Sequence, residues 1–188
     1  GFAAGELGHV GDDRAQLAQT LVAAVDRCDA ILTSGGASAG DEDHVSALLE
    51  QTGSMGLWRI ALKPGRPLAL GLWAGVPVFG LPGNPVAAFV CTLIFGAPAF
   101  RVLAGGEWRA PQGVMVPAAF SKRKKPGRRE YLRARLTPDG AAEVFSSEGS
   151  GRISGLAWAD GLFYLFVGAA FFTPGTPVRY IPFGSFAI

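Results

Sequence analysis

A short apolar run that ends in paired glycines constrains the fold of this chain most strongly. The run AIL at 30–32 is followed by TSGG at 33–36, and a helical spacing of apolar residues begins at Val45 and continues with Leu48 and Leu49. A buried strand, a glycine loop and a helix in this order are typical of a layered α/β sheet. In such a sheet the loop lies at the carboxyl end of a parallel strand.

The alternation of strands and helices extends to about residue 105. The elements that we expect are a helix after the N-cap pair Asp12 and Asp13, strands at 57–62, 68–72 and 76–79, and an apolar helix from Pro85 toward Leu103 that Pro98 disturbs. We therefore predict an α/β domain with a mostly parallel sheet over residues 1–105.

The pattern changes after the glycine pair at 105–106. From residue 111 onward, short apolar segments are separated by glycine, proline and aspartate, and YLRARL at 131–136 alternates in the manner of a half-exposed strand. These features predict a small all-β domain, a barrel or sandwich, over residues 111–188.

Charge supports this division of the chain. Residues 1–110 hold seven Lys or Arg against ten Asp or Glu, whereas residues 111–188 hold ten against five. Such an asymmetry indicates two units with different electrostatic roles.

The hydrophobic fraction of 49% is typical of a globular chain. Cys28 and Cys91 lie in apolar segments, which is typical of reduced core cysteines in a cytoplasmic protein.

Two apolar stretches have the composition of membrane spans but not the length. The stretch 86–100 contains Gly96 and Pro98 and falls short of the roughly 20 residues that a span requires, and 162–172 is shorter still. Residues 1–5 lack the basic and apolar regions of a signal peptide. We expect no membrane span, and the missing initiator Met is typical of a fragment or a processed piece.

The glycine loop and the acidic residues behind it suggest an anion site with a cation. Backbone N–H groups of Gly35, Gly36, Ser38 and Gly40 can cradle an anion, although a plain strand-to-helix turn has the same composition. Asp41, Glu42 and Asp43 follow at the opening of a helix, where acidic residues also serve as caps. Asp12 together with one of these carboxylates is suited to hold Mg²⁺ against a phosphate.

Two further loops carry charge or capping signals. In RIALKPGRP at 59–67, two prolines and a glycine stiffen a loop that presents Lys63 and Arg66. A solvated basic loop is the plain alternative, but three cations beside an acidic loop favour an anionic ligand. In GLPGNP at 80–85, Asn84 suits an N-cap and Pro85 the first helical position, so this motif by itself indicates helix capping.

Together, TSGGASAGDEDH, WRIALKPGRPLA and GLPGNPVAA resemble the C-terminal portion of the molybdopterin molybdenumtransferase family, in this order and spacing. PGRREYLRARL and VRYIPF extend the resemblance through the tail, so that it covers nearly the whole chain. The resemblance implies a molybdopterin-binding α/β domain, incomplete at its N-terminus, followed by a small β-barrel domain. It also implies insertion of molybdate into adenylated molybdopterin with release of AMP.

The resemblance assigns roles to individual positions. Asp12 and Asp43 correspond to carboxylates linked to Mg²⁺ and to cleavage of the adenylated pterin, so they count as both metal and catalytic residues. The implied catalytic cations are Arg59 and Lys63. The residues implied to bind the pterin or the oxyanion are Gly35, Gly36, Ser38, Gly40, Arg66, Pro67, Asn84, Arg128 and Ser154.

The chain departs from the family pattern in three ways. It begins inside the family's third domain, whereas the family's active site lies between this domain and a domain of the other subunit. Ala87 stands where a serine is frequent, near the proposed molybdate pocket. Arg59 and Arg66 replace lysines, and a guanidinium fork binds oxyanions with a different geometry.

Two alternative functions stay open on the sequence. A molybdopterin adenylyltransferase shares the α/β domain but lacks a basic β tail, and a non-catalytic pterin-binding or scaffold fragment fits the missing N-terminal part. Nucleic-acid binding through the basic run 122–125 is disfavoured because no aromatic stacking platform accompanies it. The resemblance implies a homodimer for the intact protein, with molybdopterin adenylyltransferase and recipient molybdoenzymes as partners.

Overall fold

The computed structural model describes residues 2–36, 44–51, 55–57, 60–65, 68–147, 149 and 151–186. The elements of the first half are α1 Arg14–Val25, β1 Ile31–Ser34, α2 His44–Gln51, β2 Met55–Leu57, β3 Leu62–Lys63, β4 Ala69–Trp73, β5 Val76–Leu81, α3 Pro85–Cys91, η1 Thr92–Gly96 and α4 Ala97–Leu103. Those of the second half are β6 Val114–Pro117, β7 Lys122–Lys124, β8 Arg129–Leu136, β9 Ala142–Val144, α5 Ser154–Trp158, β10 Gly161–Leu165, β11 Ala170–Phe172, β12 Pro177–Pro182 and η2 Phe183–Phe186.

The first sheet has the strand order β1-β5-β4-β2 and confirms the α/β class. The expectation of a mostly parallel sheet is wrong for the described strands, because β1 and β5 are parallel whereas β4 pairs antiparallel with both β5 and β2. The reason lies in the connection between β4 and β5. Only Ala74 and Gly75 separate these strands, and both have positive φ angles, as in a tight hairpin turn that forces antiparallel pairing.

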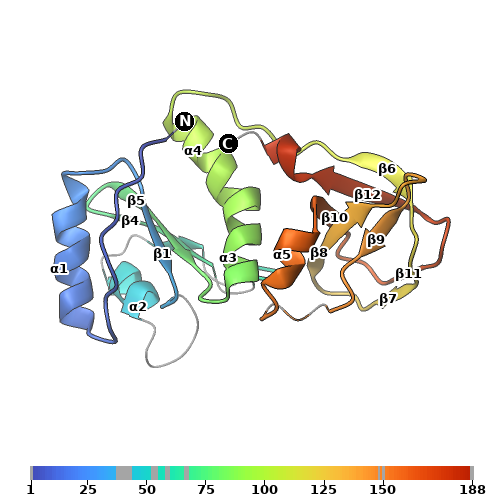
Figure 1. Ribbon diagram of the computed structural model, residues 1–188. Helices are drawn as coiled ribbons and strands as arrows, with labels where there is room; N and C mark the ends of the chain where they lie inside the picture. Colours follow the sequence, from blue (N-terminus) through green and yellow to red (C-terminus); the bar gives the residue numbers. More distant parts are fainter. Residues whose placement is uncertain are drawn as a thin grey trace.

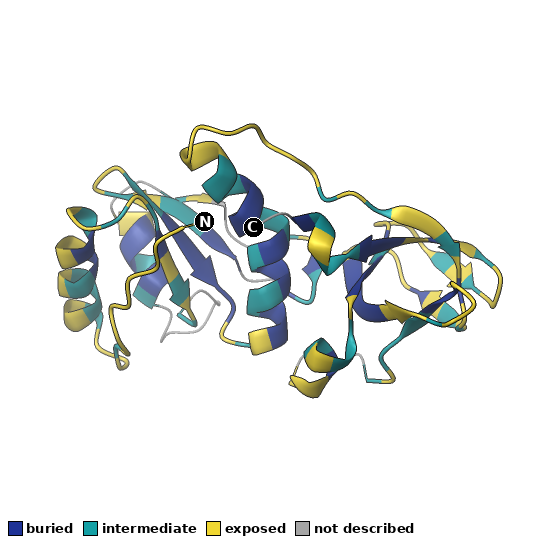
Figure 2. Ribbon diagram, turned by 45° about the horizontal axis from the view of Figure 1, so that its top comes forward, coloured by how far each residue is buried: buried dark blue, intermediate teal, exposed yellow. Residues whose placement is uncertain are grey.

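Helices cover this sheet on both faces (Figure 1). On one side, buried Leu21 of α1 and Leu49 of α2 share a core with Ile31 of β1 and Val78 of β5. On the other side, α3 lies between the first sheet and the second half of the chain (Figure 1), and Figure 2 shows its inner face buried. The order of layers is therefore helices, sheet, helix and then the second sheet.

The apolar helix expected from Pro85 is continuous to Leu103 and is the one described helix long and apolar enough to cross a membrane by length and composition. The expected disturbance near Pro98 is confirmed, as a change of helix type and not as a break. A π-helical turn, η1, precedes Pro98, whose missing N–H removes one α-helical hydrogen bond, and the Ala97 N–H bonds to the Thr92 carbonyl. A core helix meets the same criteria, and Val90 packs in a core shared by both halves.

The second sheet has the order β3-β8-β10-β12-β6, with β9 paired to β8, and β7 and β11 form a separate two-stranded ribbon. The tail is thus all-β apart from α5 and η2, as expected. The described strands form no closed barrel, since the sheet runs from β3 to β6 and only an isolated bridge of Ala118 to Ala142, with the Ala119 N–H donating to the Ala142 carbonyl at 2.7 Å, links the end of β6 to β9. A barrel requires hydrogen bonds between its first and last strands.

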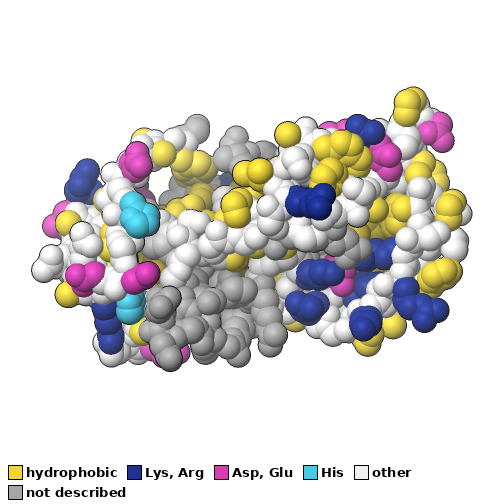
Figure 3. All heavy atoms as spheres, turned by 60° about the horizontal axis from the view of Figure 1, so that its bottom comes forward, with side chains coloured by type: hydrophobic (Ala, Val, Ile, Leu, Met, Phe, Trp, Pro, Cys, Tyr) yellow, Lys and Arg dark blue, Asp and Glu magenta, His cyan; other side chains and the backbone are white. Residues whose placement is uncertain are grey.

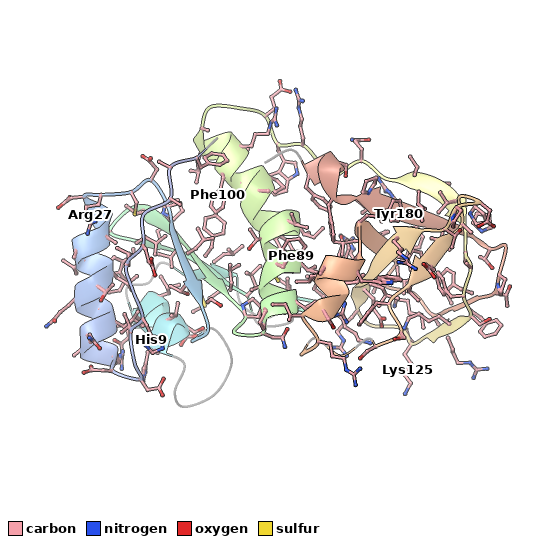
Figure 4. The ribbon with its side chains drawn as sticks, in the orientation of Figure 1. His9, Arg27, Phe89, Phe100, Lys125 and Tyr180 are labelled. Atoms are coloured by element: carbon pink, nitrogen blue, oxygen red, sulfur yellow. The ribbon has the colours of Figure 1, made fainter. Side chains whose placement is uncertain are left out.

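The two halves share one apolar core. Leu81 and Val90 from the first half lie in a cluster with Leu162 and Ile181 from the second. The ring of Phe89, labelled on α3 in Figure 4, packs edge-on against Phe183 at a centroid distance of 5.3 Å. This contact holds α3 against the end of β12.

Candidate functional site

Residues 60–65 are fixed to the second sheet by a short parallel strand pair. Leu62 aligns with Arg129 and Lys63 with Glu130, and the Arg129 N–H donates to the Ala61 carbonyl at 2.8 Å. A segment from the first half of the sequence therefore forms an edge of the second sheet. This pairing places the Lys63 side chain beside β8.

A cavity of about 460 Å³ opens next to Lys63, and we call it the basic cavity. Lys and Arg side chains gather over this half of the molecule, on the right of Figure 3. The residues that line the basic cavity are Lys63, Ser121, Lys122, Arg123, Lys125, Pro126, Arg128 and Glu130. With five cations and one carboxylate in its wall, the cavity suits an anionic ligand.

Glu130 is the one carboxylate in the wall of the basic cavity, and it is 8% exposed. Its Oε2 lies 3.6 Å from Lys63 Nζ and 3.6 Å from Lys122 Nζ. Both distances exceed hydrogen-bond length, and this buried Oε2 accepts no hydrogen bond. The carboxylate therefore holds two ammonium groups near one another by charge, at the edge of a cavity that an anion can enter.

Lys124 fixes the turn that forms one wall of the basic cavity. Its side chain is 2% exposed, and its Nζ donates to the carbonyl oxygens of Lys125, Val167 and Gly168 at 2.9, 3.4 and 3.2 Å. The Gly127 N–H donates to the Val167 carbonyl at 3.0 Å. These bonds tie the turn that precedes Arg128 to the loop after β10, while the Lys125 side chain projects outward (Figure 4).

Gly65 sets the distance between the Lys63 segment and α3. Its φ angle is +109°, and a Cβ at this position would lie 2.4 Å from Cys91 Sγ. Only glycine fits such a close approach. Burial raises the pKa of the Cys91 thiol to about 12, so this cysteine is an inert core group, and both cysteines are free thiols as expected.

The glycine loop after β1 lies beside the loop after β5, at the carboxyl ends of two parallel strands. The Gly35 N–H donates to the Leu81 carbonyl at 3.0 Å, and a Cβ on Gly83 would lie 3.4 Å from the Gly35 Cα. The Gly35 amide thus joins the two loops and is already paired. Gly36, with a φ of +67°, continues the turn toward α2.

Asn84 acts as the N-cap predicted from the sequence. Its Oδ1 accepts hydrogen bonds from the backbone N–H groups of Val86 and Ala87 at 3.1 and 3.3 Å. Pro85 occupies the first turn of α3. The first amides of this helix are therefore satisfied by the chain itself.

The acidic residues implied to hold Mg²⁺ are only partly described. Asp13 caps α1 by accepting from the N–H groups of Ala15 and Gln16, and the exposed Asp12 precedes it. Asp43 lies outside the described residues. Within the described ranges, no three His, Cys, Asp or Glu side chains come together as a metal site.

Arg133 shapes the segment before Ser154. Its guanidinium donates to the carbonyl oxygens of Ser147, Gly149 and Arg152 at 2.5, 3.0 and 2.5 Å, and it lies 5.0 Å from the ring centre of Phe145. Ser154 is exposed at the start of α5 and does not line the basic cavity.

Of the residues singled out from the sequence, the structure brings Lys63 and Arg128 into one cavity. Sequence reasoning missed Lys122 and Glu130 as site residues; the signal was the basic run at 122–125 next to PGRRE at 126–130. The predicted residues that lie outside the described part of the chain are Ser38, Gly40, Asp43, Arg59, Arg66 and Pro67.

Two family models match the chain. Residues 1–102 match the model described as a probable molybdopterin binding domain, and residues 115–183 match the model described as the MoeA C-terminal region (domain IV). The first match covers more than half of the chain, and together they extend over both sheets.

Curated and solved relatives agree with these matches. The chain is 36% identical to a molybdopterin molybdenumtransferase of Haemophilus influenzae, over 68% of this chain and 32% of that protein. It is 32% identical to the protein of the same name from Nostoc, over 92% of this chain and 42% of that protein. A structure of the molybdopterin biosynthesis MoeA protein from Pyrococcus horikoshii superposes with a TM-score of 0.76 at 27% identity, over 92% of this chain and 41% of that one. The chain thus spans about a third to two fifths of these relatives.

Proposed function

Because the chain belongs to the family of probable molybdopterin binding domains, we propose that it performs the step for which its curated relatives are named. In this step molybdate is inserted into adenylated molybdopterin, AMP is released, and the molybdenum cofactor is formed. The chain is then part of a molybdopterin molybdenumtransferase.

The observation that carries this proposal is the basic cavity. Lys63 from the first half of the sequence and Arg128 from the second line the same space, with Lys122 as a further cation. Molybdate and phosphate are both tetrahedral oxyanions, so an ammonium and a guanidinium in one cavity suit either. The parallel pairing of β3 with β8 supports a common function for the two halves, since it joins the KPG motif to the tail.

The chain's own residues bind and orient in this mechanism. Lys63 and Arg128 hold the oxyanion, and Glu130 keeps the Lys63 and Lys122 ammonium groups close to one another. The glycine loop at Gly35 and Gly36 supports the pterin end. When bound, Mg²⁺ would polarise the pyrophosphate bond. The described residues provide no ligand set that fits the ion, and the other implied ligand, Asp43, lies outside them, so no step is assigned to it.

A pterin-binding fragment without catalytic activity is the second candidate. Binding alone requires only a pocket for an anion, and the basic cavity supplies one. A molybdopterin adenylyltransferase is less well supported, since the match of residues 115–183 to the MoeA C-terminal region extends beyond the α/β domain that such an enzyme shares.

We propose further that the intact protein is a cytoplasmic homodimer. It receives adenylated pterin from molybdopterin adenylyltransferase and delivers the cofactor to recipient molybdoenzymes. The exposed Met115 and Val114 on edge strand β6 support an interface with another chain.

The test is molybdate-dependent release of AMP from adenylated molybdopterin by this chain, measured with Mg²⁺ present and compared with Asp43→Asn. Release that depends on molybdate and is lost in the variant supports the transferase. Binding of the pterin without release of AMP favours the binding fragment. Absence of both binding and release contradicts the proposal.

A further inference from the structure

We infer that the exposed part of the second sheet binds single-stranded nucleic acid, with bases stacked on its aromatic rings and phosphates held by its arginines. The residues concerned are Arg129, Tyr164, Phe166 and Arg179, which we call the arginine–aromatic face. None of these four residues lines the basic cavity. The inference goes beyond the proposed function and does not depend on it.

Strand pairing places these side chains on one side of the sheet. Strands β8, β10 and β12 lie side by side (Figure 1), and Tyr164 of β10 is aligned with Tyr131 of β8 and with Arg179 of β12. Residues that are directly opposite in paired antiparallel strands share a face. Tyr131, Tyr164 and Arg179 therefore form a row across the sheet.

Phe166 and Arg129 lie next to this row. The Phe166 ring lies edge-on to the Tyr164 ring at a centroid distance of 5.2 Å, and the Arg129 guanidinium lies 5.3 Å from the Tyr164 ring centre. Burial raises the pKa of the Tyr131 hydroxyl, and the charges of Arg129 and Arg179 oppose that rise. Both guanidinium groups therefore lie near the same small group of rings.

The arginine–aromatic face is open to solvent. Phe166 is 66% exposed, both arginines are exposed, and Tyr164 is half-buried. The same side of the sheet is buried at its other end, where Leu162 packs in a core with Val90 of α3. A large exposed ring between charged side chains is typical of an interaction site.

The charge of this face is positive. Glu130 is the one acidic residue of strands β6, β8, β10 and β12, and it projects to the opposite side of β8, where it lines the basic cavity. Gly113 makes room for Arg179, because a Cβ at this glycine would lie 2.8 Å from Arg179 Nε. A polyanion in solvent therefore meets two guanidinium groups and no carboxylate on these strands.

These observations define the ligand class. Each nucleotide of a single strand carries a flat base and a phosphate, so a series of nucleotides matches rings that lie between guanidinium groups. Three strands about 4.8 Å apart span roughly 10 Å, which is room for about two stacked bases. An acidic peptide offers the charge but no regular series of flat rings. The aromatic platform that the sequence lacks beside the run 122–125 is thus present in the structure, next to two other arginines.

The experiment measures the affinity of the chain for two oligonucleotides of equal length and charge by fluorescence anisotropy at low salt. One is an oligothymidylate of about ten nucleotides, and the other carries abasic sites in place of its bases. We expect the strand with bases to bind about tenfold tighter or more, because each base stacked on a ring adds to the affinity. Molybdate added in excess occupies the basic cavity, and this ratio should persist.

Three variants make the result specific. Phe166→Ala should weaken binding of the oligothymidylate about tenfold and leave binding of the abasic strand unchanged. Arg179→Gln should weaken binding of both strands and lower the salt dependence by about one phosphate contact. Phe171→Ala is the matched control, because this ring is 63% exposed but belongs to β11, whose Phe172 packs against Phe163 on the opposite side of the sheet. Circular dichroism verifies that each variant is folded.

Equal affinity for the two oligonucleotides overturns the inference, as does the absence of binding or an unaltered ratio in Phe166→Ala. Displacement of the oligothymidylate by polyglutamate of equal charge assigns the face to an acidic protein and also overturns it. An oligouridylate distinguishes RNA from DNA. Tighter binding of either strand with bases than of the abasic strand supports the inference.

Discussion

The Lys63 ammonium lies 3.6 Å from the Glu130 carboxylate, and the two residues are aligned neighbours in the parallel strands β3 and β8. Backbone pairing therefore fixes an ion pair between distant parts of the sequence. The Lys63 side chain remains 34% exposed toward solvent, whereas that of Glu130 is 10% exposed. This arrangement positions a cation that can still reach a ligand.

Replacing Lys63 by methionine should weaken binding of a phosphate ester by about tenfold to a hundredfold, because one charge-assisted contact is lost. Glu130 keeps Lys122 as a neighbour, so the free energy of unfolding should change by about 1 kcal/mol or less. Calorimetric titration and urea unfolding measure the two quantities. Arg27→Met, an exposed change near the end of α1, is the control and should alter neither.

Replacing Gly65 by alanine should destabilise the fold by about 2–4 kcal/mol, because the added Cβ meets Cys91 Sγ and the φ angle of +109° strains any other residue. Urea unfolding measures the effect. The double variant Gly65→Ala with Cys91→Ala should recover the part of the lost stability that comes from the clash with Cys91 Sγ. The part that comes from the strained φ angle should remain. Gly184→Ala, at an open position, is the control. An equally small effect at both glycines would contradict the packing described for Gly65.

Replacing Arg133 by methionine should lower the free energy of unfolding by about 2–4 kcal/mol, because three carbonyl oxygens lose a charged donor. Arg133→Lys should recover only part of this loss, since one ammonium cannot span the same acceptors. Hydrogen exchange should quicken selectively across 145–156. Arg135→Met, on the exposed part of the same strand, should cost about 1 kcal/mol or less.

Alkaline pH should destabilise the protein through Cys91. Burial raises the pKa of this thiol from 9.0 to about 12 in the folded state, so the unfolded chain loses its proton first as pH rises. The contribution of the Cys91 thiol to the free energy of unfolding is fully present below pH 9. It is lost between about pH 9 and 12, at up to about 1.4 kcal/mol per pH unit.

The measurement is the free energy of unfolding as a function of pH. Cys91→Ala should flatten the curve between pH 9 and 12, and Cys28→Ala serves as the matched control. Burial also raises the pKa values of Tyr131 and Tyr180, so these tyrosines add a similar loss above about pH 10 that both variants retain. An unchanged curve for Cys91→Ala would show that the thiol is not buried in solution.

The sequence predicted the local elements well where the signals were short-range. Asp13 and Asn84 cap helices as their positions indicated, because capping depends on only a few neighbouring residues. The direction of the first sheet was predicted less well, since the pairing of β4 with β5 depends on a two-residue turn at Ala74 and Gly75 whose φ angles are not visible in the composition.

Strand β8 illustrates the same limit. Its alternating sequence predicted a half-exposed strand, yet the residues from Glu130 to Ala134 are all buried. β10 pairs with this strand, β3 and β9 pair with its ends, and the Arg133 guanidinium is enclosed by carbonyl oxygens. The alternation of polar and apolar residues shows only which side chains are polar, whereas their burial depends on which elements cover each face of the sheet.

The sequence by itself determined the family, the α/β class and the all-β tail, and it identified Lys63 and Arg128 as candidate site residues. These results follow from motifs and local periodicity. Only the tertiary structure decided that Lys63 and Arg128 share one cavity and that Glu130 and Lys122 belong to it. The physical reason is that the pairing of β3 with β8 and the contact of Gly65 with Cys91 join residues distant in the chain. No local pattern encodes such long-range contacts.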